Sequence, residues 1–290
     1  MDKAEKQGTG YTGRSRPQDR ETAYAKSQAL GRIYRHMISP SGGTTGQHQR
    51  TRGVLYIATG LPHIQAAIES AVSVRKTNPN LPIHLFADLL QQKFDLNVGI
   101  KMNPFTSWEN IPNPHRRSKV DYIAATPFEE TLYLDTDTRV LCGLHDPFRL
   151  LERFDVALAH AHRREVLQKN ERLTIRVPSA FPEFNSGVLF YKRNFETIKA
   201  FQSWQQRYYE GKLNVDQPAL REILWSNNLR IATLPPEYNV RFLKYILMWS
   251  KDEAQPKILH LGFYRRGMGY YYQRWRRSIV RRFSRHTQLS

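Results

Sequence analysis

The sequence lacks most features that would stabilise a small secreted domain or hold the chain in a membrane. It has one cysteine, Cys142, so no disulfide can form within the chain. No uninterrupted apolar run approaches the roughly 18 residues that a membrane-spanning helix needs. The first residues, Met1–Lys6, lack the apolar core of a signal peptide. These absences favour a cytoplasmic protein.

Acidic residues are missing from one end of the chain. Residues 264–290 carry eight arginines and no Asp or Glu, and residues 1–53 carry ten basic and four acidic residues. The two ends therefore supply +14 of the net charge of +18, and residues 54–263 are close to neutral. Such a distribution favours anionic surfaces as partners of the ends.

The two basic ends differ in pattern. Residues 1–53 are rich in Gly, Ser, Thr, Gln and Arg, and we predict a disordered tail with a short helix around 21–37. In 264–290 apolar residues recur every four positions among the arginines, which predicts a basic amphipathic helix. We expect this helix to contact an anionic membrane surface, which would place the protein peripherally at the inner face of a membrane. Docking on the chain's own domain is the alternative, and nucleic acid is the least favoured partner.

A regular alternation of strands and helices begins at Val54. Val54–Ala58 is a continuous apolar run, typical of a strand buried on both faces. The apolar residues from Ile64 to Val74 follow helical spacing, and Asn78-Pro79-Asn80 ends that helix. Ile83–Ala87 is the next strand. Strand, helix and strand within about 35 residues predict a βαβ unit and hence a parallel sheet.

The same pattern continues to residue 263. We predict further helices at Arg117–Ala125, Phe195–Glu210 and Pro218–Trp225, and further strands at Thr131–Leu134, Val156–Ala159, Gly187–Tyr191 and Ile258–Leu261. The sequence therefore predicts a single α/β domain of Rossmann-like type over residues 54–263, with a mainly parallel central sheet.

Two aspartates, Asp135 and Asp137, directly follow the predicted strand that ends at Leu134. Ligands of parallel α/β sheets gather at the carboxyl ends of the strands. Residues two apart in extended chain point the same way, so both carboxylates could face one hard divalent cation. The alternative is ordinary turn and cap chemistry.

Two classes of enzyme carry Asp-x-Asp after a strand. In the haloacid dehalogenase superfamily of phosphohydrolases the first Asp is a nucleophile, and residues 135–138, Asp-Thr-Asp-Thr, match that box. In glycosyltransferases of the GT-A fold the pair holds a metal ion that bridges the donor diphosphate. The context favours the transferase, because a βαβ unit of about 80 residues precedes the pair. The only adjacent acids after it are Asp252-Glu253, with no strand before them.

Residues 54–263 resemble retaining GT-A enzymes, especially glycosyltransferase family 8, the group of glycogenin and bacterial galactosyltransferases. Four segments carry the resemblance: Val54–Gly60, Arg117–Asp137, Phe184–Val188 and Asn214–Pro218. The family usually ends with His-x-x-Gly-x-x-Lys-Pro-Trp, whereas this chain has His260-Leu261-Gly262-Phe263 and lacks the Lys-Pro-Trp.

The resemblance implies roles for particular residues. It implies Mn²⁺ or Mg²⁺ as cofactor, bound by Asp135, Asp137 and His260, and a catalytic pair at Asp216 and Gln217. It implies donor binding by Ala58, Thr59, Gly60, Lys119, Asp135, Thr136, Asn185, Ser186 and Gly187. The residues themselves leave simpler explanations open: a hydrogen-bonded histidine at 260, a turn at 185, surface charge at 119 and a helix N-cap at 216.

We therefore expect a metal-dependent glycosyltransferase that moves a sugar from a nucleotide-sugar donor, with UDP as the expected nucleotide, to a glycan, lipid-linked or protein acceptor. The Asp-Gln pair favours retention of anomeric configuration. Two alternatives stay open: a phosphohydrolase with Asp135 as nucleophile, and a non-catalytic protein of GT-A fold that binds anionic surfaces.

Removal of residues 264–290 separates membrane attachment from catalysis. We expect the shortened protein to lose binding to anionic vesicles, because the eight arginines are gone, and to keep donor-sugar hydrolysis. Vesicle co-sedimentation and a hydrolysis assay measure the two properties. Unchanged vesicle binding would refute the membrane role, and absence of hydrolysis in both folded proteins would favour the non-catalytic alternative.

Overall fold

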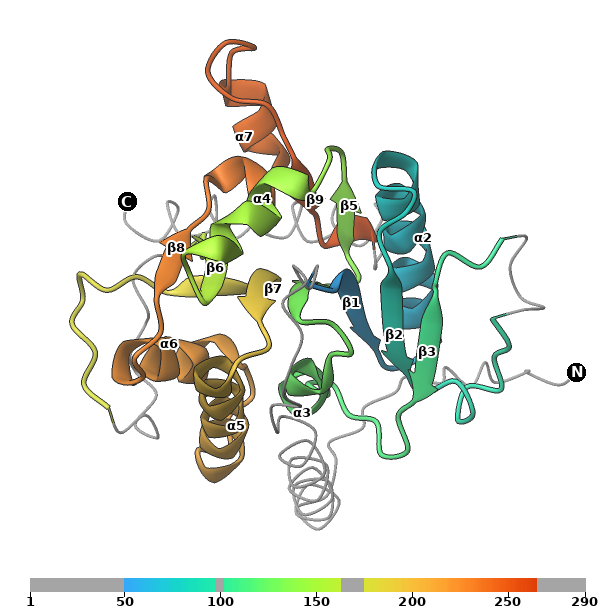
Figure 1. Cartoon of the computed structure of the whole chain (residues 1–290), viewed down its shortest axis with the longest axis horizontal. Helices are drawn as coiled ribbons and strands as arrows, with labels where there is room; N and C mark the ends of the chain where they lie inside the picture. Colours follow the sequence, from blue (N-terminus) through green and yellow to red (C-terminus); the bar gives the residue numbers. More distant parts are fainter. Residues whose placement is uncertain (1–49, 97–101, 163–174, 265–290) are drawn as a thin grey trace, which may run out of the picture. The chain divides into compact units, whose positions relative to one another are not determined.

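The structure is a computed structural model that describes residues 50–96, 102–162 and 175–264 (Figure 1). The predicted disordered tail, up to residue 49, and the predicted basic helix, from residue 265, lie outside the described residues. None of the helices in the described ranges has the length and apolar character needed to cross a bilayer.

A seven-stranded sheet forms the centre of the fold (Figure 1). Its order is β3-β2-β1-β4-β7-β6-β8, and every strand is parallel to the others except β7, so the prediction of a mainly parallel sheet is confirmed. A second sheet pairs β5 with β9. The strands are β1 (Arg52–Ala58), β2 (Ile83–Ala87), β3 (Ser107–Asn110), β4 (Glu130–Leu134), β5 (Thr138–Val140), β6 (Val156–His160), β7 (Phe184–Lys192), β8 (Ile231–Thr233) and β9 (Ile258–His260).

Helices flank this sheet on both faces. They are α2 (Leu61–Thr77), α3 (Lys119–Tyr122), α4 (His145–Arg149), α5 (Phe195–Glu210), α6 (Gln217–Ser226) and α7 (Leu243–Met248), with short 3₁₀ turns η1 (Ile123–Ala125), η2 (Leu150–Glu152) and η3 (Pro236–Asn239). Each helix and strand predicted between residues 54 and 263 is present, within three residues at either end. The unpredicted elements β3, β5, β8, α4 and α7 have three to six residues each, too few to show a hydrophobic period.

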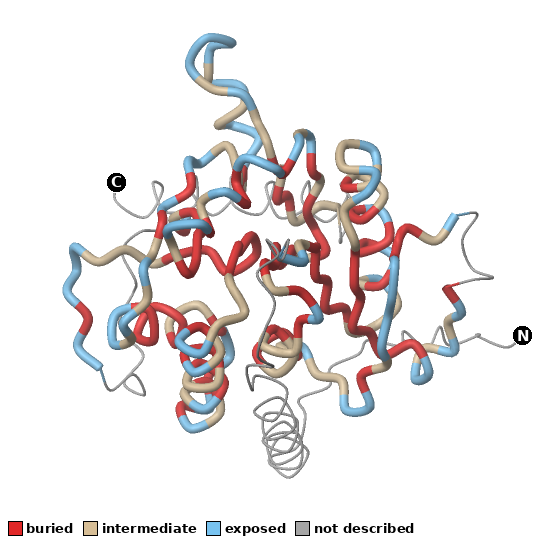
Figure 2. Tube along the Cα trace, in the orientation of Figure 1, coloured by how far each residue is buried: buried red, intermediate tan, exposed pale blue. Residues whose placement is uncertain are grey.

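The two faces of β1 explain why its sequence is a continuous apolar run. Val54, Tyr56 and Ala58 pack into the hydrophobic cluster that contains the buried face of α2. Leu55 and Ile57 pack into the opposite cluster, which contains the buried residues of α3, α5 and α6. Figure 2 shows the buried residues running along the central strands and the inner helix faces. Because both faces are covered, alternation with polar residues is absent.

The strand order reverses between β1 and β4. From β1 the chain adds β2 and then β3 on one side, and it then places β4 on the other side of β1. The carboxyl ends of β1 and β4 therefore lie side by side at a switch point, where open α/β sheets form a ligand crevice. Thr59-Gly60 follow β1 at this crevice, and Asp135 follows β4.

Asp155 joins the beginning of β6 to β8 and to the N-terminus of α5. Its carboxylate accepts hydrogen bonds from Arg230 Nε (3.0 Å) and Nη2 (2.9 Å) and from Asn194 Nδ2 (3.0 Å). The hydrogen bonds from Arg230 outweigh burial and lower the pKa of Asp155 to about 2.

We expect Asp155→Asn to lower the free energy of unfolding by about 1 kcal/mol near neutral pH, since solvent at the exposed Arg230 screens part of the interaction. A depressed folded-state pKa stabilises above the ordinary value of 3.8, and the contribution is lost as the pH falls toward 2. Urea unfolding of both proteins across this range measures the difference. Asp252→Asn, in an exposed turn, is the control. A difference that does not shrink at low pH would contradict this account.

Candidate active site

Three predicted metal ligands converge at the switch-point edge of the sheet. One ligand atom from each of Asp135, Asp137 and His260 lies within 4.8 Å of the other two. His260 Nε2 is 3.3 Å from Asp137 Oδ1 and 3.6 Å from Asp135 Oδ2. The aspartates lie in a turn after β4 rather than in extended chain, and Thr138 Oγ1 closes this turn by donating to the carbonyl oxygen of Asp135 at 2.8 Å. The turn, not strand alternation, brings the two carboxylates together.

Two antiparallel pairings assemble this cluster. In the small sheet Thr138 of β5 pairs with His260 of β9, which brings the imidazole to the aspartates across more than a hundred residues of chain. In the large sheet β7 runs antiparallel to β4, and Asp135 N donates to the carbonyl oxygen of Gly187 at 2.8 Å. A Cβ at Gly187 would lie 2.6 Å from Asp135 Oδ2 and would collide with the ring of His260. Glycine is therefore required here because a carboxylate and an imidazole occupy the space.

A chain of amide groups fixes the orientation of His260. The backbone N–H of Gly187 donates to Asn185 Oδ1 at 3.0 Å, and Asn239 Nδ2 donates to the same oxygen at 2.9 Å. The remaining oxygen of Asn239 then faces His260 Nδ1 at 2.8 Å, so Nδ1 carries the proton. In the neutral ring Nε2 consequently presents a lone pair to the two aspartates, as a metal ligand requires.

This donor set fits a divalent cation. Adjacent ligands of an octahedral ion at about 2.1 Å lie about 3 Å apart, close to the separations seen between His260 and the aspartates. Carboxylate oxygens suit Mg²⁺ and Mn²⁺, and the imidazole nitrogen favours the transition metal of the two. Asp137 and His260 are buried, so the cluster is shielded from bulk water except at Asp135.

The buried ammonium of Lys119 joins this cluster to Asp216. Lys119 Nζ lies 2.9 Å from Asp216 Oδ2, 3.5 Å from Asp135 Oδ1, and 2.7 Å from Ser186 Oγ, to which it donates. Burial raises the pKa of Asp135, but the charge of Lys119 opposes it, and that pKa is held well below its usual range. The explanation of Lys119 as ordinary surface charge is thus wrong.

Asp216 occupies the N-cap position of α6 but does not cap the helix with its side chain. Its Oδ1 pairs with Arg117 Nη1 at 3.0 Å, while its Oδ2 accepts from Ser186 Oγ at 2.8 Å and pairs with Lys119. Burial raises the pKa of Asp216, and Lys119 and Arg117 together lower it below the ordinary value. Asp216 is therefore an ionised carboxylate surrounded by two cations and a hydroxyl. Gln217 begins α6 directly after it.

The loop after β1 is held at the same edge. Asp88, at the end of β2, accepts from Gly60 N at 2.8 and 3.1 Å, and Thr59 Oγ1 donates to the carbonyl oxygen of His115 at 3.1 Å. Gly60 has φ 86°, a conformation that glycine adopts without strain. Ala58 is buried at the end of β1. Thr136 is buried in the aspartate turn.

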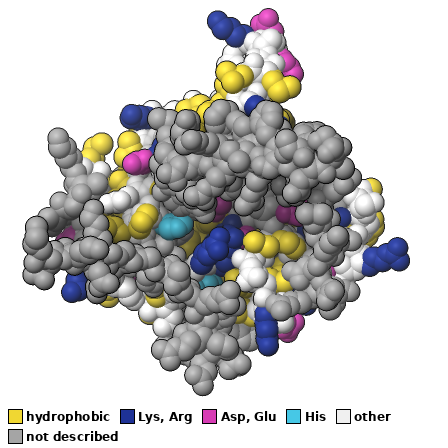
Figure 3. Space-filling model, turned by 180° about the vertical axis from the view of Figure 1, so that it is seen from behind, with side chains coloured by type: hydrophobic (Ala, Val, Ile, Leu, Met, Phe, Trp, Pro, Cys, Tyr) yellow, Lys and Arg dark blue, Asp and Glu magenta, His cyan; other side chains and the backbone are white. Residues whose placement is uncertain are grey.

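A second set of contacts fixes the basic segment before β4. His115 Nε2 pairs with Asp121, and Tyr209 OH donates to the same carboxylate at 2.9 Å. These contacts tie the segment carrying Arg117 and Lys119 to α5. Figure 3 shows basic side chains gathered near the centre of one face, with acidic and histidine side chains close by.

Several residues of this site were not predicted from the sequence. Arg117 pairs with Asp216, Asn239 contacts His260, and Asp88 accepts from Gly60 N, and none of these three was among the predicted site residues. Asp88 directly follows a predicted strand, which is a usable signal. Asn239, in a Pro-Glu-Tyr-Asn stretch of a 3₁₀ turn, carries no such signal.

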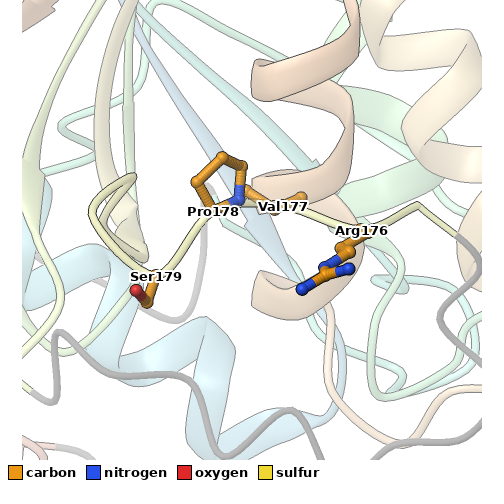
Figure 4. A pocket seen from close by; sticks show the side chains of 4 residues that line it. All are labelled: Arg176, Val177, Pro178 and Ser179. Atoms are coloured by element: carbon orange, nitrogen blue, oxygen red, sulfur yellow. The ribbon is translucent and has the colours of Figure 1, made fainter.

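A separate surface hollow of about 500 Å³ is lined by Arg176–Ser179 and contains none of the predicted site residues (Figure 4). Arg221 of α6 holds this segment by donating to the carbonyl oxygens of Pro178 (2.7 Å) and Phe181 (2.9 Å).

Comparison with known proteins gives a family match over part of the chain and a shared fold. Residues 130–269 match the family model of nucleotide-diphospho-sugar transferases, a range that begins with β4 and includes Asp135, Asp137, Asp216 and His260. A search of curated proteins finds no match.

Solved glycosyltransferase structures share the fold. The galactosyltransferase LgtC, in complex with donor and acceptor sugar analogues, aligns over 72% of this chain and 86% of its own, with a TM-score of 0.53 and 14% identity. The glycosyltransferase GlyE of Streptococcus pneumoniae TIGR4 aligns over 72% of this chain and 54% of its own, with a TM-score of 0.50 and 19% identity. Mouse xyloside xylosyltransferase 1 aligns over 72% of this chain and 97% of its own, with a TM-score of 0.50 and 12% identity.

The mixed α/β architecture is thus that of GT-A glycosyltransferases, as predicted. The family match over residues 130–269 agrees with the fold of a nucleotide-sugar glycosyltransferase. The phosphohydrolase alternative is not favoured, and Asp252 and Glu253 lie exposed in a turn rather than at a strand end. The narrower resemblance to family 8 stays a prediction.

We expect Gly187→Ala to weaken binding of Mn²⁺ by about tenfold or more, because the new methyl group must displace Asp135 or His260. Gly143→Ala is the matched control, since no atom lies within 4 Å of a Cβ at that position. Titration calorimetry measures the affinity, and circular dichroism checks that both variants fold. Equal affinity in the two folded variants would show that the cluster at Gly187 is not where the ion binds.

Proposed function

We propose that this protein is a metal-dependent glycosyltransferase that uses a UDP-linked sugar as donor. The observation that carries the proposal is the convergence of Asp135, Asp137 and a tautomer-fixed His260 at the switch point of a GT-A sheet. Mn²⁺ or Mg²⁺ held by these three residues would neutralise the charge that develops on the leaving diphosphate.

The loop after β1 and the strand β7 supply the rest of the proposed donor site. Backbone at Ala58, Thr59 and Gly60 lies at the carboxyl end of β1, where the nucleotide would sit. Asn185 Oδ1 is taken up by Gly187 N and Asn239, so its amide N–H groups are the part left to bind sugar hydroxyls. Together with backbone at Gly187, these groups would orient the sugar.

Lys119 supplies positive charge between the proposed metal ligand Asp135 and the carboxylate of Asp216. Its ammonium lies against Asp135, Asp216 and Ser186, so it would hold the metal carboxylate and the α6 carboxylate at a fixed separation. We assign it to binding of the donor, where a buried cation stabilises phosphate charge. Thr136 would bind the donor through the same turn.

The state of Asp216 supports retention of anomeric configuration. An inverting reaction needs a carboxylate base beside the acceptor. Both oxygens of Asp216 are engaged by Arg117, Lys119 and Ser186, so Asp216 is not a free base. We assign Gln217 to the sugar-facing position beside it. A second LgtC structure carries a glutamine-to-glutamate change at its active site, so a glutamine belongs to the active site of that enzyme, and we propose the same for Gln217.

The acceptor proposed is a glycan, a lipid-linked saccharide or a protein. Attachment of residues 264–290 to an anionic membrane surface would favour the lipid-linked class, and peripheral location at the inner face of a membrane would follow.

Titration with UDP in the presence and absence of Mn²⁺ tests the proposal. We expect binding of UDP to strengthen at least about tenfold with Mn²⁺, and Asp137→Asn to abolish this gain because it removes a charged ligand. Hydrolysis of a panel of UDP-sugars is measured in parallel. Asp146→Asn, exposed on α4, is the control variant.

Absence of both UDP binding and donor hydrolysis in the folded wild-type protein would overturn the proposed function. Hydrolysis that is equal without metal and in Asp137→Asn would overturn only the metal site.

A further inference from the structure

The side-chain amide of Gln217 is held in one orientation. Its Nε2 donates to Glu183 Oε1 at 2.8 Å and lies 3.3 Å from the carbonyl oxygen of Phe184, which accepts the second N–H. Within the described part of the chain, no group donates to Gln217 Oε1. The amide therefore directs both of its donors into the protein and leaves its oxygen as the group available to a ligand.

Glu183 is well placed to fix this orientation. It directly precedes β7, and its own carbonyl oxygen accepts from Ala161 N at 2.8 Å, so its backbone is anchored to the end of β6. The side chain is half-buried, and burial raises the pKa of its carboxyl, with the Gln217 hydrogen bond and the charge of Arg221 acting against that rise. The negative charge of Asp216 raises the pKa of Glu183 further.

The chemistry of a carboxylate makes this contact selective. An ionised Glu183 can only accept hydrogen bonds, so it can pair with the N–H groups of Gln217 but not with its oxygen. A rotation of the amide by 180° would place Gln217 Oε1 against the carboxylate and against the carbonyl of Phe184, which are both acceptors. The opposite orientation is therefore excluded by electrostatic repulsion as well as by lost hydrogen bonds.

We infer that Glu183 is a positioning residue that sets the Gln217 amide with its carbonyl oxygen toward the substrate. The inference rests on the proposed function, in which Gln217 faces the transferred sugar. An oxygen presented at that place would stabilise positive charge on the sugar carbon as the bond to the leaving diphosphate breaks. Glu183 acts only through Gln217 and does not touch the sugar.

Nuclear magnetic resonance of the side-chain amides tests the contact without any assay of activity. Glutamine is labelled with ¹⁵N, and the Gln217 signal is assigned by its loss in Gln217→Ala. We expect its Nε2 protons to exchange with water more slowly in the wild-type protein than in Glu183→Ala at about pH 8, where the carboxyl is ionised. Gln206 is the internal reference, because it donates to Glu210 at 2.7 Å in a solvent-exposed pair.

Kinetics with the preferred UDP-sugar and Mn²⁺ test the role. We expect Glu183→Gln to lower kcat about tenfold at nearly unchanged KM, because an amide partner permits both orientations of Gln217. In a Gln217→Ala background the same change should cause no further loss, since the two residues act as one unit. Glu210→Gln alters the equivalent exposed pair and is the matched control.

The outcomes separate the inference from the proposed function. An equal loss from Glu183→Gln with and without Gln217 would overturn the inference, because Glu183 would then act independently of Gln217. Rapid exchange of the Gln217 amide in the wild-type protein would also overturn it. Slow exchange of the Gln217 amide in a protein that neither binds UDP nor hydrolyses donors would support the contact with Glu183 and would refute the proposed function instead.

Discussion

Like charges held close together at one edge of the sheet set the requirements for the rest of this site. Asp135, Asp137 and Asp216 lie in or beside the crevice, and two of these carboxylates share a single ammonium, that of Lys119. Buried carboxylates are costly unless they are paired or bind a cation. The fold meets part of this requirement by burying Lys119 between Asp135 and Asp216 and by adding Arg117 beside Asp216. The same arrangement leaves a concentration of negative charge that a divalent cation would complete.

The supporting residues explain why small and amide side chains gather around the charged ones. Gly187 leaves room for the carboxylate of Asp135 and the ring of His260, and Asn185 and Asn239 relay one orientation from a backbone N–H to the imidazole. The hydroxyl of Thr138 has a structural role, because it closes the aspartate turn. It is also hydrogen-bonded to Ser70, which is in turn hydrogen-bonded to Tyr56 in the core. The turn therefore explains the threonine at 138, which completes the match of residues 135–138 to the phosphohydrolase motif.

The sequence predicted the strands and long helices well because their signals are local. The run at Val54–Ala58 and the helical spacing at Phe195–Glu210 reflect burial that each segment needs on its own faces. It also named the aspartate pair and His260 as candidates, since the aspartates follow a strand and His260 lies at the end of one. It missed Arg117 and left a helix cap open as the explanation of Asp216, because the direction of a side chain on a short turn cannot be read from the sequence. Asn239 and Glu183 gave no signal, since the residues that they contact are far away in sequence.

What the sequence determined by itself is the α/β layering and the chemical types available at the strand ends, because hydrophobic periodicity and strand-end position are properties of neighbouring residues. Tertiary structure alone decided which of those groups meet. The antiparallel placement of β7 beside β4 and of β9 beside β5 joins residues 135, 187 and 260 and makes glycine necessary at 187. Asn239 of η3 then fixes the tautomer of His260, and Lys119 of α3 meets Asp135 and Asp216. Distances between atoms depend on pairing and register across the whole sheet, and these are fixed by long-range packing rather than by any one segment.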